Sequence, residues 1–417
     1  MNTRRVDTEL YYSGTNVSEQ VKRYLESISY TDVASGSSDT LSVVLDNTDK
    51  RWMGDWMPVK GDRMKAGIYG RHWEMEGDTA KLNCGEFEID SLSFGGSPNR
   101  CTIGAVSIPQ SEEFNCRKRT KTWEGITIQR IAEEISGNAG VDLYYEADTI
   151  YIESIEQNSQ EDCKFLYSLC QDYGLAMKVY AWKIVIFDEE RYEKRPVAVS
   201  FEEEEVAPGW SYRTEVAGTY TGASVGFTDP ENDEDYLIRI GGGSRILELN
   251  ITADNLADAE RKGIAKLNDA NKKMTTMSIT VKFNPRVTAG SCIQLNGFAR
   301  LSGKYYVEKA VTKASGSGET SMSLSLRLVV DRIKSVSVQA VEAAQEQEQK
   351  AGTDYTVVSG DTLWDIARRF LGSGVRYVEI YNGNMDVIES TAKGRGKKNS
   401  GNGHWIFPGT VLRIPPA

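Results

Sequence analysis

The first 110 residues consist of short segments in which hydrophobic and polar residues alternate. Turn residues separate these segments. Leu41, Val43 and Leu45 occupy every second position, so one side of an extended strand there is apolar. This spacing predicts a small antiparallel barrel or sandwich, and we expect most of its tryptophans in the core. The expected strands are residues 9–12, 39–45, 63–69, 86–94 and 101–108, and the tryptophans are Trp52, Trp56 and Trp73.

Helical spacing replaces the alternation over residues 111–200. Hydrophobic residues recur at intervals of three and four in two stretches, which predicts two amphipathic helices. Ser159 and Asp162 have the spacing of a capping box before the second helix, while Gly137 and Gly174 are the expected helix ends. Two strands, residues 175–180 and 183–187, complete a mixed α/β segment. The predicted buried faces are Ile128, Ile131, Ala132 and Ile135, then Leu166, Leu169, Cys170 and Tyr173.

Alternation returns over residues 201–333, which we interpret as a second antiparallel β-barrel domain. A strand is expected at residues 246–251, and Met322, Leu324, Leu326 and Leu328 should face one side of a later strand. The four glutamates at residues 202–205 are expected in a solvated loop. Residues 334–353 are rich in Ala, Glu and Gln, which is typical of a linker.

Residues 354–417 have a pattern of their own. Thr362 and Asp365 have capping-box spacing, and the apolar stripe of the following helix ends at Gly372. A second helix over residues 375–381 should bury Val378 and Tyr381. A strand at residues 411–414 is expected to pair with residues 355–358, giving a strand–helix–helix–strand module.

This last stretch resembles the LysM family of glycan binders through SGDTLWDIA, YNGN and IFPGTVLRIP. The resemblance implies a shallow groove for N-acetylglucosamine chains, as in peptidoglycan, although docking to a neighbouring protein is the alternative. The insertion STAKGRGKKNSGNG departs from the family pattern; we expect a solvated, mobile loop, the alternative being attraction of anionic wall polymers. The implied groove residues are Gly360, Asp361, Thr362, Leu363, Asn382, Ile406, Phe407 and Pro408.

The body of the chain resembles the late control protein D family of phage tail baseplate hubs. The resemblance rests on the order of IAEEISGNAG, SQEDCKFLYSLCQDYGLAMKV, KIVIFD, ADNLADAERKGIAKLNDAN and the Ser/Leu alternation near residue 325. It implies an α+β multidomain chain in which two barrel-like hub domains, residues 1–110 and 201–333, flank the mixed segment. The implied assembly is a homotrimer joining a six-fold tail tube to a three-fold spike.

The same resemblance implies a structural protein of the virion tail baseplate, assembled in the host bacterial cytoplasm. The expected partners are the tail tube protein, a spike or tip protein and the tape measure protein. Peptidoglycan is a further partner if the LysM groove binds glycan. A contractile particle is favoured, and phage, defective prophage and bacteriocin all remain open.

Composition narrows the alternatives. The net charge of −11, from 60 acidic and 49 basic residues, disfavours nucleic-acid binding. The first residues, MNTRRVDTELYY, contain no apolar run of signal-peptide length, and no stretch of the chain approaches the 18 apolar residues of a membrane span. The chain has two histidines and no C-x-x-C among its six cysteines, so we expect no enzyme activity, cofactor, metal site or disulfide framework. A wall-hydrolase accessory and a LysM-anchored wall protein are the competing hypotheses.

Overall fold

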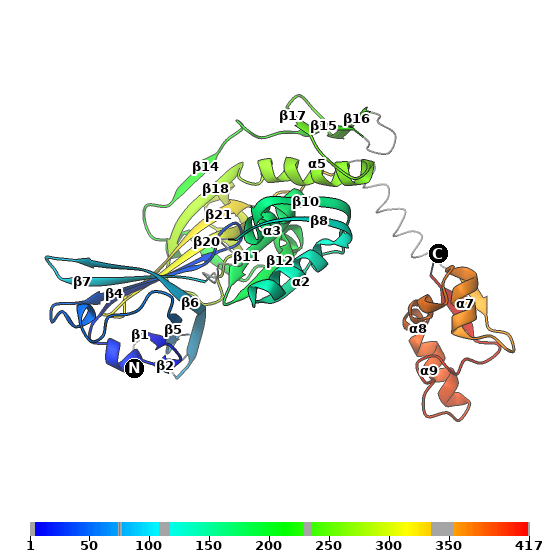
Figure 1. Cartoon of the computed structure of the whole chain (residues 1–417), viewed down its shortest axis with the longest axis horizontal. Helices are drawn as coiled ribbons and strands as arrows, with labels where there is room; N and C mark the ends of the chain where they lie inside the picture. The colour runs from blue at the N-terminus through cyan, green and yellow to red at the C-terminus, as the bar shows by residue number, and fades with distance from the viewer. Residues whose placement is uncertain are drawn as a thin grey trace. The chain divides into compact units, whose positions relative to one another are not determined.

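The computed structural model describes residues 5–73, 75, 77–107, 117–228, 235–334 and 353–415. The chain divides into two compact units, Met1–Ile333 and Lys334–Ala417 (Figure 1). We describe each unit by itself. The predicted linker, residues 334–353, lies outside the described residues except at its two ends.

A 13-stranded sheet dominates the first unit. It combines the strands of residues 1–110 with those of residues 201–333. At one side, β19 (Cys292–Asn296) pairs with β20 and with β13 (Val199–Glu202). Along the main path of the sheet, each strand pairs with the next in the order β14 (Ser211–Thr214), β18 (Thr275–Val281), β21 (Thr320–Leu328), β20 (Gly303–Ser315), β3 (Leu25–Val33), β4 (Thr40–Asp46), β7 (Arg100–Val106), β6 (Thr79–Gly95), β5 (Arg63–Arg71), β1 (Arg5–Tyr12) and β2 (Thr15–Asn16).

One antiparallel pair, β3 with β20, joins the two halves of this sheet. Its register runs from Val33 opposite Lys309 to Ser27 opposite Ser315. The expectation of two barrel-like domains is therefore not confirmed: within the described residues the hydrogen-bonded order ends at β14, β2 and β13, and no closed barrel forms. Alternation identifies a strand but not its partner, and β20 uses one edge for β21 and the other for β19 and β3.

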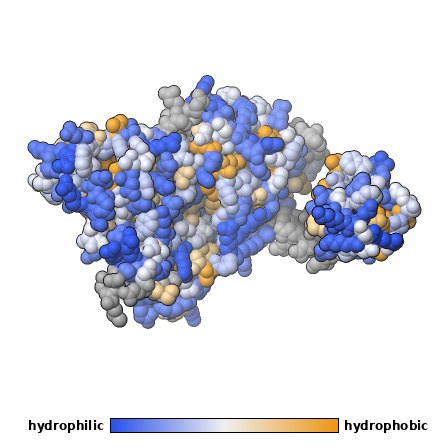
Figure 2. Space-filling model, turned by 90° about the horizontal axis from the view of Figure 1, so that it is seen from below, coloured by the Kyte–Doolittle hydropathy of each residue, from blue (hydrophilic) through white to orange (hydrophobic). Residues whose placement is uncertain are grey.

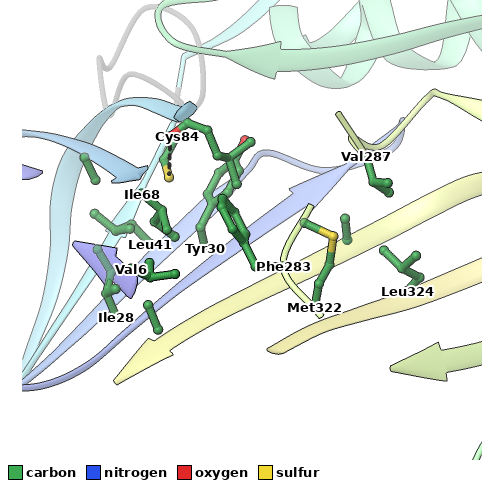
Figure 3. Packing of buried hydrophobic residues seen from close by; sticks show 14 of the residues in the cluster. Val6, Ile28, Tyr30, Leu41, Ile68, Cys84, Phe283, Val287, Met322 and Leu324 are labelled. Carbon is green, nitrogen blue, oxygen red and sulfur yellow. Dashed lines mark hydrogen bonds between the residues drawn. The ribbon is translucent and has the colours of Figure 1, made fainter. Parts of the chain in front are cut away.

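A single hydrophobic core lies along both halves. In Figure 3, Ile28, Leu41 and Ile68 of the early strands belong to the same cluster as Met322 and Leu324 of β21. The expected faces of β4 and β21 are confirmed, except that Leu328 is only partly buried. All three tryptophans contact this core, with Trp52 buried and Trp56 and Trp73 partly buried. Trp73 also joins the halves directly, because its ring meets Phe283 edge-on at 5.2 Å.

The mixed segment has its own core. β8 (Lys118–Thr127) pairs with β10 (Tyr151–Glu161), and β9 (Asp142–Glu146), β12 (Lys183–Asp188) and β11 (Leu175–Tyr180) form a second sheet. The stripe on α2 (Ile128–Ala139) is buried as predicted, but the helix ends at Gly140, three residues after the expected stop. The capping role of Ser159 is wrong, because this residue extends β10; Glu161 precedes α3 (Asp162–Asp172) without a side-chain cap. The predicted face of α3 is buried.

Two buried clusters of charged side chains attach this segment to the large sheet. The Nζ of Lys178 on β11 lies 2.7 Å from Asp32 of β3 and 3.3 Å from Asp39. Burial raises the pKa of Asp39 to about 6, although Lys178 opposes this. In the second cluster, Arg327 of β21 contacts Glu193 at 2.6 Å and Glu308 at 2.5 Å. Glu193 belongs to α4 (Glu189–Lys194), which follows β12.

A further three-stranded sheet, β16–β15–β17, carries a helix on one face. The helix is α5 (Leu256–Asn271), and Gly263 allows its close approach, because a Cβ there would lie 2.6 Å from Val225. The four glutamates are exposed as expected, although three of them form a short 3₁₀ helix. The remaining bounds are β15 (Gly222–Thr228), β16 (Asp235–Gly241), β17 (Ile246–Asn250), α1 (Ser18–Val21), η1 (Arg51–Met53), η3 (Glu203–Glu205) and η4 (Ala299–Leu301).

Within residues 353–415, the second unit has a strand pair, three α-helices and one 3₁₀ helix around a separate core. β22 (Thr353–Thr356) pairs antiparallel with β23 (Val411–Ile414), so the predicted pairing is confirmed with its first strand displaced by two residues. The prediction that Val378 is buried is wrong: it is 45% exposed, and Ile380 takes its place. The helices are α7 (Leu363–Phe370), η5 (Gly374–Arg376), α8 (Tyr377–Gly383) and α9 (Met385–Gly394).

Functional groups of several common kinds are sparse in the part of the chain that the structure describes. No three His, Cys, Asp or Glu side chains there are grouped so as to hold a metal ion. The five described cysteines are unpaired. None of the described helices combines the length and apolarity needed for a membrane span. On the face shown in Figure 2, hydrophobic residues are scattered within a mainly hydrophilic surface.

Candidate functional site

The loop between β22 and α7 is held by its own hydrogen bonds. Asp361 accepts from the Tyr355 hydroxyl at 2.7 Å and from the Val358 N–H at 2.9 Å. Partial burial opposes ionisation of Asp361, but these bonds and the charge of Arg369 lower its pKa overall. Gly360 has φ of +94°, which favours glycine in this tight turn. The loop therefore presents a fixed backbone and an ionised carboxylate.

Thr362 begins α7 as the sequence predicts. Its Oγ1 accepts from the Asp365 N–H at 3.1 Å, and its hydroxyl donates to the Asp365 carboxylate at 2.8 Å. Leu363, Ile366 and Ala367 then enter the core of the unit. Leu363 is only 2% exposed, so its side chain packs in the core beneath the loop and is not part of the surface that a ligand could contact.

The loop before β23 lies beside the first loop. The Val357 N–H donates to Thr410 O at 2.9 Å, and the Gly409 N–H donates to Val357 O at 2.8 Å. These bonds bring Phe407 and Pro408 next to the segment that carries Gly360. Phe407 and Ile406 are half-buried and Pro408 is exposed. Asn382 is exposed near the end of α8. Backbone groups and apolar side chains in such neighbouring loops suit a sugar ring, which needs both.

The insertion after α8 differs from the expected mobile loop, since its first residues belong to α9. Ile388 and Ala392 of α9 are fully buried. Met385, Ile388 and Ala392 lie at positions i, i+3 and i+7, which is helical spacing. The glycines and lysines that follow favoured a loop instead. Ser400 is also fully buried and is hydrogen-bonded to Glu389 through both its N–H and its hydroxyl. The second half of the insertion is thereby tied to α9.

The tied insertion then passes over residues at the start of α7. A Cβ at Gly403 would lie 2.4 Å from Leu363 Cδ1 and 2.9 Å from Tyr381 Cδ2, so only glycine permits this approach. Gly403 also has a positive φ of +80°. The insertion thus borders the loops that hold the predicted groove residues, a contact that the sequence pattern did not reveal.

Both the C-terminal module and the body are similar to known proteins. Residues 355–391 match the family model described as LysM domain. Over 68 residues, 16% of this chain and 29% of the relative, the chain is 41% identical to "Uncharacterized protein YqbP" of Bacillus subtilis (strain 168). Over 163 residues, 39% of each, it is 26% identical to the "Probable baseplate hub protein" of Escherichia phage 186. The chain therefore matches less than two fifths of either relative's length.

The fold of the body also has a solved counterpart. A tail protein from Neisseria meningitidis MC58 superposes with a TM-score of 0.59 over 78% of this chain and 96% of that one. The identity is 12%, so this likeness concerns the fold alone. The chain thus carries a LysM domain at its C-terminal end, and its body has the fold of a phage tail protein, with a curated baseplate hub protein among its relatives.

Proposed function

We propose that this chain is a structural baseplate hub of a contractile phage tail or phage-like particle. The observation that carries the proposal is the relationship to the "Probable baseplate hub protein" of phage 186. The tail-protein fold of the body supports it. The relatives are tail and baseplate proteins, which favours a structural role over an enzymatic one.

We further propose that three copies assemble around an axis. Each copy brings two β-rich halves, joined through β3 and β20 into one sheet. Three such copies would present six related edges to a six-fold tail tube while keeping three-fold symmetry towards a spike. One continuous sheet meets this requirement as well as two separate barrels would, because the requirement concerns two comparable surfaces per chain.

The assembly is tested by the mass of the purified full-length chain in solution. One chain has a mass of 46.4 kDa, so light scattering should give three times this value. A monomer at all concentrations would contradict the hub assignment and favour a wall-anchored protein. Electron microscopy of intact particles with an antibody to the chain should then place it at the tail tip.

For the C-terminal module we propose contact with peptidoglycan through the two neighbouring loops. The predicted groove residues Gly360, Asp361, Thr362, Asn382, Ile406, Phe407 and Pro408, supported by Leu363, would cover one face of an N-acetylglucosamine chain. Three copies on one hub would bind together, raising avidity about 10²- to 10⁴-fold over one module.

The full chain should sediment with purified peptidoglycan. Phe407→Ala removes the aromatic surface beside the first loop and should release most of the bound protein. Val375→Ala serves as the control, since Val375 is 66% exposed on η5 and is not among the predicted groove residues. Equal retention of both variants, or no retention of the parent chain, would contradict glycan binding and favour docking to another tail protein.

A further inference from the structure

The insertion at residues 390–403 is a fixed part of the LysM module. Beyond the Glu389–Ser400 bonds, the Gly403 N–H donates to Ser400 Oγ at 2.9 Å and the Trp405 N–H donates to Ser400 O at 2.8 Å. The Tyr381 hydroxyl donates to the same Glu389 carboxylate at 2.9 Å. Glu389 is therefore occupied by internal donors, and the Ser400 hydroxyl is the main reason that its pKa is lowered.

This anchoring places two cations over aromatic rings. The Arg395 guanidinium lies 5.8 Å from the ring centroid of Phe407, a predicted groove residue. Lys397 Nζ lies 4.0 Å from the ring of Trp405, which is 44% exposed. Both distances are within the range of cation–aromatic attraction. Positive charge is thus held beside the loop that forms one side of the proposed groove.

These cations differ from three other arginines of the module. Arg368, Arg376 and Arg413 each have a carboxylate partner, at 3.1, 2.8 and 2.9 Å. Among the described residues, no ion pair within 4 Å engages Arg395 or Lys397. Their side chains are exposed, so their charge is directed to solvent and to anything that enters the groove.

A neutral N-acetylglucosamine chain gains little from such charges, whereas an anionic chain gains an attraction at each step along it. We propose that the insertion makes the groove a composite site for an anionic glycan, in which Arg395 and Lys397 contact carboxylate or phosphodiester groups while Trp405 and Phe407 cover apolar parts of the sugar. This inference rests on the proposed glycan binding of the same module and specifies its substrate class.

The test compares the full chain with Arg395→Gln/Lys397→Gln against three probes. The probes are neutral N-acetylglucosamine oligomers, peptidoglycan stripped of phosphodiester polymers, and purified teichoic acid, a phosphodiester polymer. The double variant should bind the neutral oligomers as the parent does. It should lose roughly 3- to 30-fold in affinity for at least one anionic probe, since each exposed ion pair contributes little by itself. The probe affected identifies the source of the negative charge.

A matched control removes two positive charges elsewhere in the chain. Lys309→Gln/Lys313→Gln changes two exposed lysines of β20 and should leave all three affinities unchanged. The parent's affinity for the anionic probe should also fall with added salt, and the double variant's should fall less. Equal loss on all probes, or no loss on either anionic probe, overturns the inference. Failure of the parent to bind neutral oligomers counts against the proposed groove itself, so the two failures are distinguishable.

Discussion

Gly316→Ala tests the pairing that joins the two halves of the body. Gly316 follows β20, and its N–H donates to Glu26 O on β3 at 2.9 Å. A Cβ at this position would lie 1.9 Å from Leu25 O and 3.0 Å from Leu25 C. Both atoms belong to the backbone of β3, so no side-chain rotation can relieve the clash.

The magnitude follows from this geometry. Real Cβ atoms stay at least 3.0 Å from such neighbours, so β3 and β20 must separate locally by more than 1 Å. Losing the hydrogen bond to Glu26 costs about 1 kcal/mol. Overpacking at a well-packed site costs about 1–3 kcal/mol. We therefore expect the variant to lose about 2–4 kcal/mol of unfolding free energy.

The assay is denaturant unfolding of the full chain, followed by tryptophan fluorescence. Gly95→Ala is the control, because Gly95 ends β6 and a Cβ there meets nothing within 4 Å. The control should stay within about 0.5 kcal/mol of the parent. If Gly316→Ala were as stable as Gly95→Ala, the β3–β20 pairing would not have the geometry described here.

Three further predictions address the buried charges and the module. Arg327→Met should cost about 3–5 kcal/mol, because it removes the most deeply buried cation of a cluster in which Arg327 contacts Glu189, Glu193 and Glu308. Thermal melting measures this loss, and Arg213→Met, at an exposed pair, should cost under about 1 kcal/mol. Because burial raises the pKa of Asp39 to about 6 from 3.8, the folded state binds this proton more tightly than the unfolded chain. As pH falls from 7 to 4, the parent should gain about 2.4 kcal/mol relative to Asp39→Asn, and a pH-independent difference would refute this. Thr362→Ala removes the α7 cap and should cost about 1 kcal/mol locally, seen as faster amide exchange in residues 363–370; Thr356→Ala, exposed on β22, should leave that exchange unchanged.

Local structure was predictable where local physics decides it. The stripe of α2, the cap at Thr362 and the buried face of β4 all follow from side-chain spacing over fewer than a dozen residues. The resemblance to LysM was likewise readable, because its motifs are short and contiguous, and residues 355–391 match that family.

Partner choice was not predictable. β3 has ordinary alternation but no sequence mark of its pairing with β20, so the two halves were assigned to separate barrels. Ser159 failed as a cap because pairing with β8 extends β10 through Glu161. In the module, the glycines and lysines of the insertion suggested mobility, whereas one buried serine and a glutamate on α9 fix its path. Each case depends on contacts between residues distant in the chain or on a buried polar group.

The pairing of β3 with β20 also determines when, during synthesis, the two halves of the body can join. Asp32, in β3, and Ala289, which donates its N–H to Asp32, are 257 positions apart, and β20 follows later still. At about 5–20 residues per second, a ribosome needs roughly 13–50 s to cover that interval. During that interval the edge of β3 that pairs with β20 has no partner strand, and unpaired strand edges promote wrong association between chains. The two halves of the body can thus join into one sheet only after β20 has emerged.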